Sequence, residues 1–137
     1  MRRINNGDEY YAFPGGGVEK SESKEEAVRR EIKEETTVEV GVRKLLYKIT
    51  WDTGDEYYFY LCDYHSGEPS FSSDASERTY VRNGNQTYEP LWVPLDAARS
   101  LRIFQLEIRD LLLEDIKDNF VRCPRELSIK LSERRQQ

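Results

Sequence analysis

Three glutamates in the first third of the chain are spaced so that they could share one divalent cation. Glu31, Glu34 and Glu35 stand at positions i, i+3 and i+4, which places them along one side of a helix. Carboxylates held this close together repel one another and need a compensating cation. Their hard oxygen atoms suit Mg²⁺ or Mn²⁺. The spacing therefore predicts a metal site, provided that this segment is helical.

The residues around these glutamates predict a helix from Ser23 to about Thr36. A Ser-x-x-Glu capping box opens it, and Ala27, Val28 and Ile32 form its apolar stripe. The glutamates overlap the arc of this stripe, whereas a purely solvated acidic face would lie opposite it. The alternative is an ordinary surface helix covered with salt bridges, which Glu-rich sequences commonly form.

A glycine-rich segment precedes this helix and could be mistaken for a phosphate-binding loop. Gly15, Gly16 and Gly17 are followed by Lys20, but Glu19 stands where a phosphate loop has the glycine before its lysine. The later glycine of a dinucleotide-binding fingerprint is also absent from the sequence. Taken alone, this glycine-rich segment therefore predicts a simple turn between a strand and a helix.

Taken together, the glycines and the charged helix resemble the Nudix box. One position of the box, residues 16–38, departs from the family pattern: Thr37 stands where the family usually has Gly, at a point that commonly needs a left-handed backbone. The lead-in from Phe13 to Glu19 also resembles the family, and a weaker resemblance extends to residues 57–63 and 89–95. The positions that match the box are Gly16, Glu22, Arg30, Glu31, Ile32, Glu34, Glu35 and Val38.

The resemblance implies an α/β fold, a Nudix-type α/β/α sandwich around a central mixed β-sheet, with residues 1–137 as a single domain. It also implies metal-dependent hydrolysis of the pyrophosphate linkage in a nucleoside diphosphate-linked substrate. Nucleoside triphosphates, nucleotide sugars and ADP-ribose are the candidate substrates, because residues 65–89 contain no pattern that distinguishes them. The alternative is a non-catalytic Nudix-like domain that binds a nucleotide or a protein.

The resemblance also assigns metal ligands. Glu34 and Glu35 would be the principal ligands of Mg²⁺ or Mn²⁺, and Glu31 would be a further ligand or would orient the attacking water. A backbone carbonyl of Gly15 or Gly16 would complete the metal shell. A pyrophosphate group carries several negative charges, so an acidic site needs such a metal before it can bind one.

Two further roles follow from the same resemblance. Arg30 would pair with Glu22 and so hold the glycine loop onto the helix. The general base would be another glutamate outside the box, with Glu89 as the first candidate and Glu68 and Glu77 as its competitors.

Outside the box, hydrophobic periodicity predicts several strands and one more helix. Trp92 is expected in the core rather than as a stacking platform for a nucleobase. Strands are expected at 10–13, 38–42, 45–51, 57–62, 79–81 and 91–93, a helix at about 104–119, and a frayed tail at about 128–137.

Composition excludes several classes of protein. The net charge of −5 and the absence of a basic tract argue against general binding to nucleic acid or to anionic membranes. Cys62 and Cys123 lack metal-ligand spacing, and His65 is the single histidine, so a zinc module is not expected. The start has no apolar core of a signal peptide, and no stretch is apolar enough for a membrane span. A cytoplasmic location is therefore expected.

The segment before the glycines is short for this family, whose members usually carry one or two strands ahead of the strand that leads into the box. The N-terminal strands are therefore expected to be shortened. Either the start has been assigned late, or another segment or subunit supplies the missing pairing. Because a bare sheet edge recruits partners, a homodimer is a further expectation.

Overall fold

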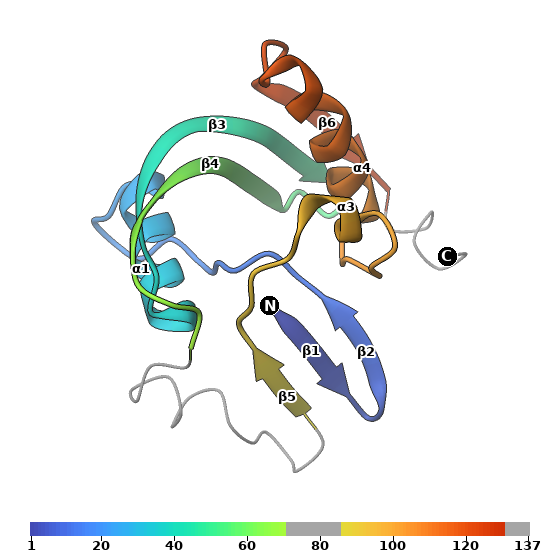
Figure 1. The fold of residues 1–137 in the computed structure, drawn as a ribbon. Helices are drawn as coiled ribbons and strands as arrows, with labels where there is room; N and C mark the ends of the chain where they lie inside the picture. The colour runs from blue at the N-terminus through green and yellow to red at the C-terminus, as the bar shows by residue number, and fades with distance from the viewer. Residues whose placement is uncertain (71–85, 131–137) are drawn as a thin grey trace.

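The computed structural model describes residues 1–70 and 86–130 of the chain and has an α/β fold with two three-stranded sheets (Figure 1). One sheet is antiparallel and has the strand order β2-β1-β5, and the other is mixed and has the order β4-β3-β6. The strands are β1 (Arg2–Asn5), β2 (Asp8–Tyr11), β3 (Glu39–Trp51), β4 (Glu56–Ser66), β5 (Gln86–Glu89) and β6 (Arg125–Ile129). The helices are α1 (Lys24–Thr36), α3 (Leu95–Ala98), α4 (Leu106–Asp115) and the 3-10 turn η1 (Ile116–Asp118).

The mixed sheet is built on β3 and β4, two long, curved strands joined by a tight turn at residues 52–55 (Figure 1). β6 pairs with β3 in parallel, with Ile49 beside Leu127. Tyr47 and Ile49 of β3 are almost fully buried and pack in one cluster with Ile108 of α4. The core therefore lies between the mixed sheet and α4.

A buried carboxylate ties the C-terminal segment to this core. Asp115, at the end of α4, is fully buried. It accepts a hydrogen bond from the hydroxyl of Tyr47 at 3.1 Å and pairs with Arg122 at 2.7 Å and Arg125 at 3.0 Å. Burying a charge is costly unless it is paired and hydrogen-bonded, and here three donors meet that requirement. β6 extends through Ile129, into the tail expected to fray from about residue 128, and residues 131–137 of that tail lie outside the described residues.

The N-terminal segment forms a hairpin, where the sequence led us to expect one strand at 10–13. Asn6 and Gly7 form the turn between β1 and β2 with φ values of 51° and 85°. This is the left-handed pair that a two-residue hairpin turn needs. β1 is thus the central strand of the antiparallel sheet. The edge of β2, expected to be bare, carries backbone hydrogen bonds between Tyr11 and both Arg102 and Phe104.

The helix of the box begins and ends as its sequence predicts. Ser23 and Glu26 form a reciprocal capping box at its start. Thr37 follows its last residue with a left-handed backbone, φ 60°, and its N–H donates to the carbonyl of Lys33. The Thr37 hydroxyl donates to the carbonyl of Glu68 at 2.8 Å. The turn therefore keeps the backbone typical of glycine, with a side chain that holds the segment after β4.

The segments around and after residue 90 differ in part from the elements expected from the sequence. Residues 91–93 do not form the expected strand, because the strand of this region, β5, ends before them at Glu89. The strand expected at 79–81 lies outside the described residues. The helix expected at about 104–119 corresponds to α4 followed by η1. No helix in the described part of the chain is long and apolar enough to cross a membrane.

Candidate functional site

Arg30 is the centre of a cluster that joins the glycine-rich loop to α1. Its guanidinium donates to Glu22 at 2.7 and 3.2 Å and to the backbone carbonyl of Gly17 at 3.0 Å. It also donates to Glu31 at 2.8 Å and to Glu34 at 3.3 Å. The arginine and both Glu22 and Glu31 are largely shielded from solvent. One side chain therefore fixes the loop against the acidic side of the helix.

Glu35 is held separately, by the loop backbone. Its carboxylate accepts a hydrogen bond from the N–H of Gly15 at 2.8 Å. Burial raises the pKa of Glu35 above its ordinary value, while the Gly15 hydrogen bond and the nearby charge of Arg3 oppose that rise. The Glu31 carboxylate raises the pKa of Glu35 further. The Glu31 carboxylate thus acts on Glu35, as the i, i+4 spacing predicts.

Gly16 packs closely against the side chain of Glu31. A Cβ atom at this position would overlap the carboxylate of Glu31. Any larger residue would push the loop away from α1 or displace the Glu31 side chain. The glycine of the box therefore lets the loop backbone approach an acidic side chain directly.

The donor set suits a hard divalent cation. Glu31, Glu34 and Glu35 offer carboxylate oxygens, and the Gly16 backbone beside Glu31 offers a carbonyl oxygen, which are the donors that Mg²⁺ prefers. Within the described residues, however, no three acidic, histidine or cysteine side chains converge as ligands. Glu31 and Glu34 turn toward Arg30 instead. The residue types fit a metal, and the side chains would have to rotate to share it.

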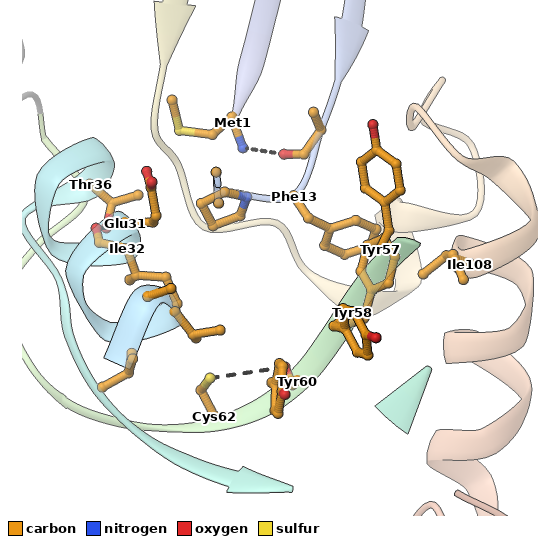
Figure 2. Close-up of a pocket in the computed structure, with 18 of the residues that line it drawn as sticks. Met1, Phe13, Glu31, Ile32, Thr36, Tyr57, Tyr58, Tyr60, Cys62 and Ile108 are labelled. Carbon is orange, nitrogen blue, oxygen red and sulfur yellow. Dashed lines mark hydrogen bonds between the residues drawn. The ribbon is translucent and has the colours of Figure 1, made fainter. Parts of the chain in front are cut away.

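A cavity of about 900 Å³ lies beside this loop and helix. Figure 2 shows Glu31 and Ile32 of α1 on one side of it and Tyr58, Tyr60 and Cys62 of β4 on another. Gly15, Gly16 and Gly17 also line it. The acidic helix therefore borders a space large enough for a nucleotide-sized ligand, since ligand pockets commonly have about 300–1,000 Å³.

The general-base candidates do not gather at this cavity. Glu89 lies on β5, where its carboxylate pairs with Arg2 at 3.0 Å, and it is not among the residues that line the cavity. Glu68 is exposed, and its backbone carbonyl accepts a hydrogen bond from the hydroxyl of Thr37. Glu77 lies outside the described residues.

Trp92 lines the cavity and does not belong to the core, which corrects the expectation from the sequence. It is 59% exposed and meets Tyr64 edge-on, with the ring centroids 5.8 Å apart. Sequence reasoning also overlooked Arg3, which lines the same cavity. The alternation of β1 could have revealed it, because successive side chains of a strand point to opposite faces.

The fold and this cluster define a class: an α/β domain in which a glycine-rich loop is clamped onto a Glu-rich helix. A family model, the NUDIX domain, matches residues 1–113. The chain therefore belongs to the Nudix family, whose members are in general hydrolases of pyrophosphate linkages. A search of curated proteins finds no significant match to the sequence.

Proposed function

We propose that this protein hydrolyses the pyrophosphate linkage of a nucleoside diphosphate-linked substrate with the help of Mg²⁺ or Mn²⁺. The observation that carries the proposal is the Arg30 cluster. It holds the loop, through Glu22 and Gly17, against the helix face that bears Glu31 and Glu34. A domain that served only as a scaffold would have no need to concentrate acidic groups beside a large cavity.

In this proposal Glu34 and Glu35 are the principal metal ligands. Glu31 is a further ligand or orients the attacking water, and a carbonyl of Gly15 or Gly16 adds a backbone oxygen. A bound divalent ion would neutralise the acidic site and lower the pKa of a coordinated water. Arg30 keeps the loop and the helix in register and balances the carboxylates when no metal is bound.

We favour Glu31 over Glu89 as the base that activates water. Glu89, expected from the sequence, is ion-paired with Arg2 and is not part of the cavity wall. Glu31 is the better candidate, because its carboxylate borders the cavity and is mostly shielded from solvent.

The test is a hydrolysis screen with Mg²⁺ over nucleoside triphosphates, nucleotide sugars and ADP-ribose, repeated in excess chelator. We expect turnover of at least one class and its complete loss on chelation. Glu35→Gln should lower the rate by at least about 100-fold, the scale of losing a key electrostatic group. Glu25→Gln is the matched control, because it removes the same charge from an exposed position of the same helix.

Two outcomes of this screen would contradict the proposal. Turnover that persists in excess chelator would exclude the metal-dependent mechanism. Nucleotide binding with no turnover of any substrate class would favour the alternative, a non-catalytic Nudix-like domain.

A homodimer stays a prediction, but the edge of β2 is not the strand edge through which we expect it to form. The edge of β2 is already bonded at Tyr11. Within the described residues, β4 has one strand neighbour, β3, and we propose the other edge of β4 as the one that would pair in a dimer. Light scattering at high micromolar concentration should detect the dimer, and a stable monomer there would contradict it.

A further inference from the structure

Arg3 has an unmet hydrogen-bonding requirement. Within the described part of the chain, its Nε is the one buried side-chain nitrogen or oxygen atom that has no hydrogen-bond partner. Leaving such a donor unsatisfied is unfavourable, and a native structure rarely does so without a reason. A ligand that brings an acceptor to this atom would meet the requirement.

The neighbouring arginine shows what a satisfied side chain looks like in this sheet. Arg2 and Arg3 are consecutive residues of β1, so they point to opposite faces. Arg2 pairs with Glu9 at 2.8 Å and with Glu89 at 3.0 Å. Arg3 forms no ion pair with any described residue, and its guanidinium lies over the ring of Tyr88, 5.1 Å from the centroid. The face of the Tyr88 ring supports the guanidinium, and the Nε atom of Arg3 still has no hydrogen-bond acceptor.

The face that carries Arg3 belongs to the cavity beside the box. Arg3 lines this cavity together with Gly15, Gly16, Gly17 and Glu31. Its positive charge is close enough to act on Glu35, although no ion pair forms between them. The cavity thus has an acidic wall and, beside it, a cation that forms no direct ion pair with any described carboxylate.

We propose that Arg3 is a substrate-binding residue that donates to a phosphate oxygen of the diphosphate group, an inference that rests on the function proposed above. The planar guanidinium presents donors in a fork that matches phosphate oxygens. Tyr88 acts as a positioning residue, because its ring holds the guanidinium at the cavity wall. In this arrangement Arg3 would bind the diphosphate directly, and Glu31, Glu34 and Glu35 would bind it through the metal that they would hold.

The test measures binding separately from turnover. The probe is methylenediphosphonate, whose bridging carbon prevents hydrolysis, titrated into the protein with Mg²⁺ by calorimetry. Arg3→Gln should weaken the Kd by about 10- to 100-fold, the scale of a hydrogen bond to a charged group. Arg2→Gln is the matched control, since it removes the adjacent arginine from the opposite face, and it should stay within about twofold of the wild type.

A second variant protects the test against a folding defect. Arg3→Lys keeps the charge but loses the planar fork, so it should bind the probe several-fold more weakly than the wild type and more tightly than Arg3→Gln. If Arg3→Gln fails to melt cooperatively, the comparison of Arg3→Lys with the wild type decides. With a hydrolysed substrate, a change at Arg3 should raise KM more than it lowers kcat.

Several outcomes would overturn the role of Arg3. These are a wild type that does not bind the probe, Arg3 variants that bind as tightly as the wild type, and an equal loss in Arg2→Gln. Failure of the proposed function has a different signature. In that case the wild type binds the probe through Arg3, yet turns over none of the substrate classes in the screen.

Discussion

Thr37, where the helix of the box ends, combines a strained backbone with stabilising contacts of its side chain. Its φ of 60° is a conformation that glycine adopts with less strain. On that ground alone, Thr37→Gly should stabilise the fold. The hydroxyl, however, donates to the carbonyl of Glu68 at 2.8 Å and lies 2.9 Å from the hydroxyl of Ser70. Replacement by glycine removes both contacts, so the structure predicts the opposite sign.

The magnitude follows from three contributions at Thr37. Relief of the left-handed strain favours glycine by about 1 kcal/mol. Loss of the two hydrogen bonds opposes it by about 0.5–1.5 kcal/mol each. The greater freedom of glycine in the unfolded chain opposes it by about 0.4–1 kcal/mol more. We therefore expect Thr37→Gly to lower the free energy of unfolding by about 1–2 kcal/mol, which is about 3–8 °C in Tm for a chain of this length.

Thermal melts in excess chelator, supported by urea titrations, measure this change. Thr37→Ser is the control, because it keeps the hydroxyl and removes the β-branch. It should melt at or slightly above the wild type. A Tm of Thr37→Gly equal to or higher than that of the wild type would show that the hydroxyl contacts contribute nothing and that backbone strain alone decides.

Three further predictions concern the charged side chains of the structure. Burial raises the pKa of Glu35, so its charge disfavours folding above the folded pKa. In chelator, Glu35→Gln should raise Tm at pH 7, and this gain should fade as the wild type becomes protonated toward pH 4.5; a lower Tm at pH 7 would contradict it. Arg30 holds the pKa of Glu22 below its ordinary value, so that charge stabilises the fold above pH 4.5. Glu22→Gln should lower Tm at pH 7 and converge with the wild type as pH falls through the folded pKa; a deficit that is constant with pH would be the contrary result. Asp115→Asn should destabilise by about 3–5 kcal/mol, as expected for a broken buried ion pair, against about 1 kcal/mol for Tyr47→Phe; equal losses in urea titrations would refute this ranking.

Features written in local sequence were predictable. The capping box and the apolar stripe gave the start and end of α1 to within a residue, because both depend on neighbours three or four positions apart. The turn between β3 and β4 was predictable for the same reason. The hairpin between β1 and β2 could also have been predicted, since Asn6-Gly7 is a strong turn signal. The short segments on either side of it were not recognised as two strands.

Features that depend on distant pairing were not predictable from this sequence. Glu89 ranked first as a base because of its position in the chain, whereas its partner, Arg2, lies 87 residues earlier in the sequence. Trp92 belongs to an apolar run, yet its exposure is set by the segments that lie around the cavity. β6 alternates between apolar and polar residues, but its parallel partner, β3, is separated from it by most of the chain.

The buried Asp115 bears on where an autonomous folding unit ends. The family match stops at residue 113, whereas the hydrogen bond to Tyr47 and the pairing of β6 with β3 both come from residues beyond that point. A fragment cut at the homology boundary would keep the whole box and all three of its glutamates. It would also leave the Tyr47 hydroxyl buried without its acceptor and expose the side of β3 that β6 covers. We expect such a fragment to aggregate. The segment needed for stable folding should therefore extend beyond the end of the family match, through β6.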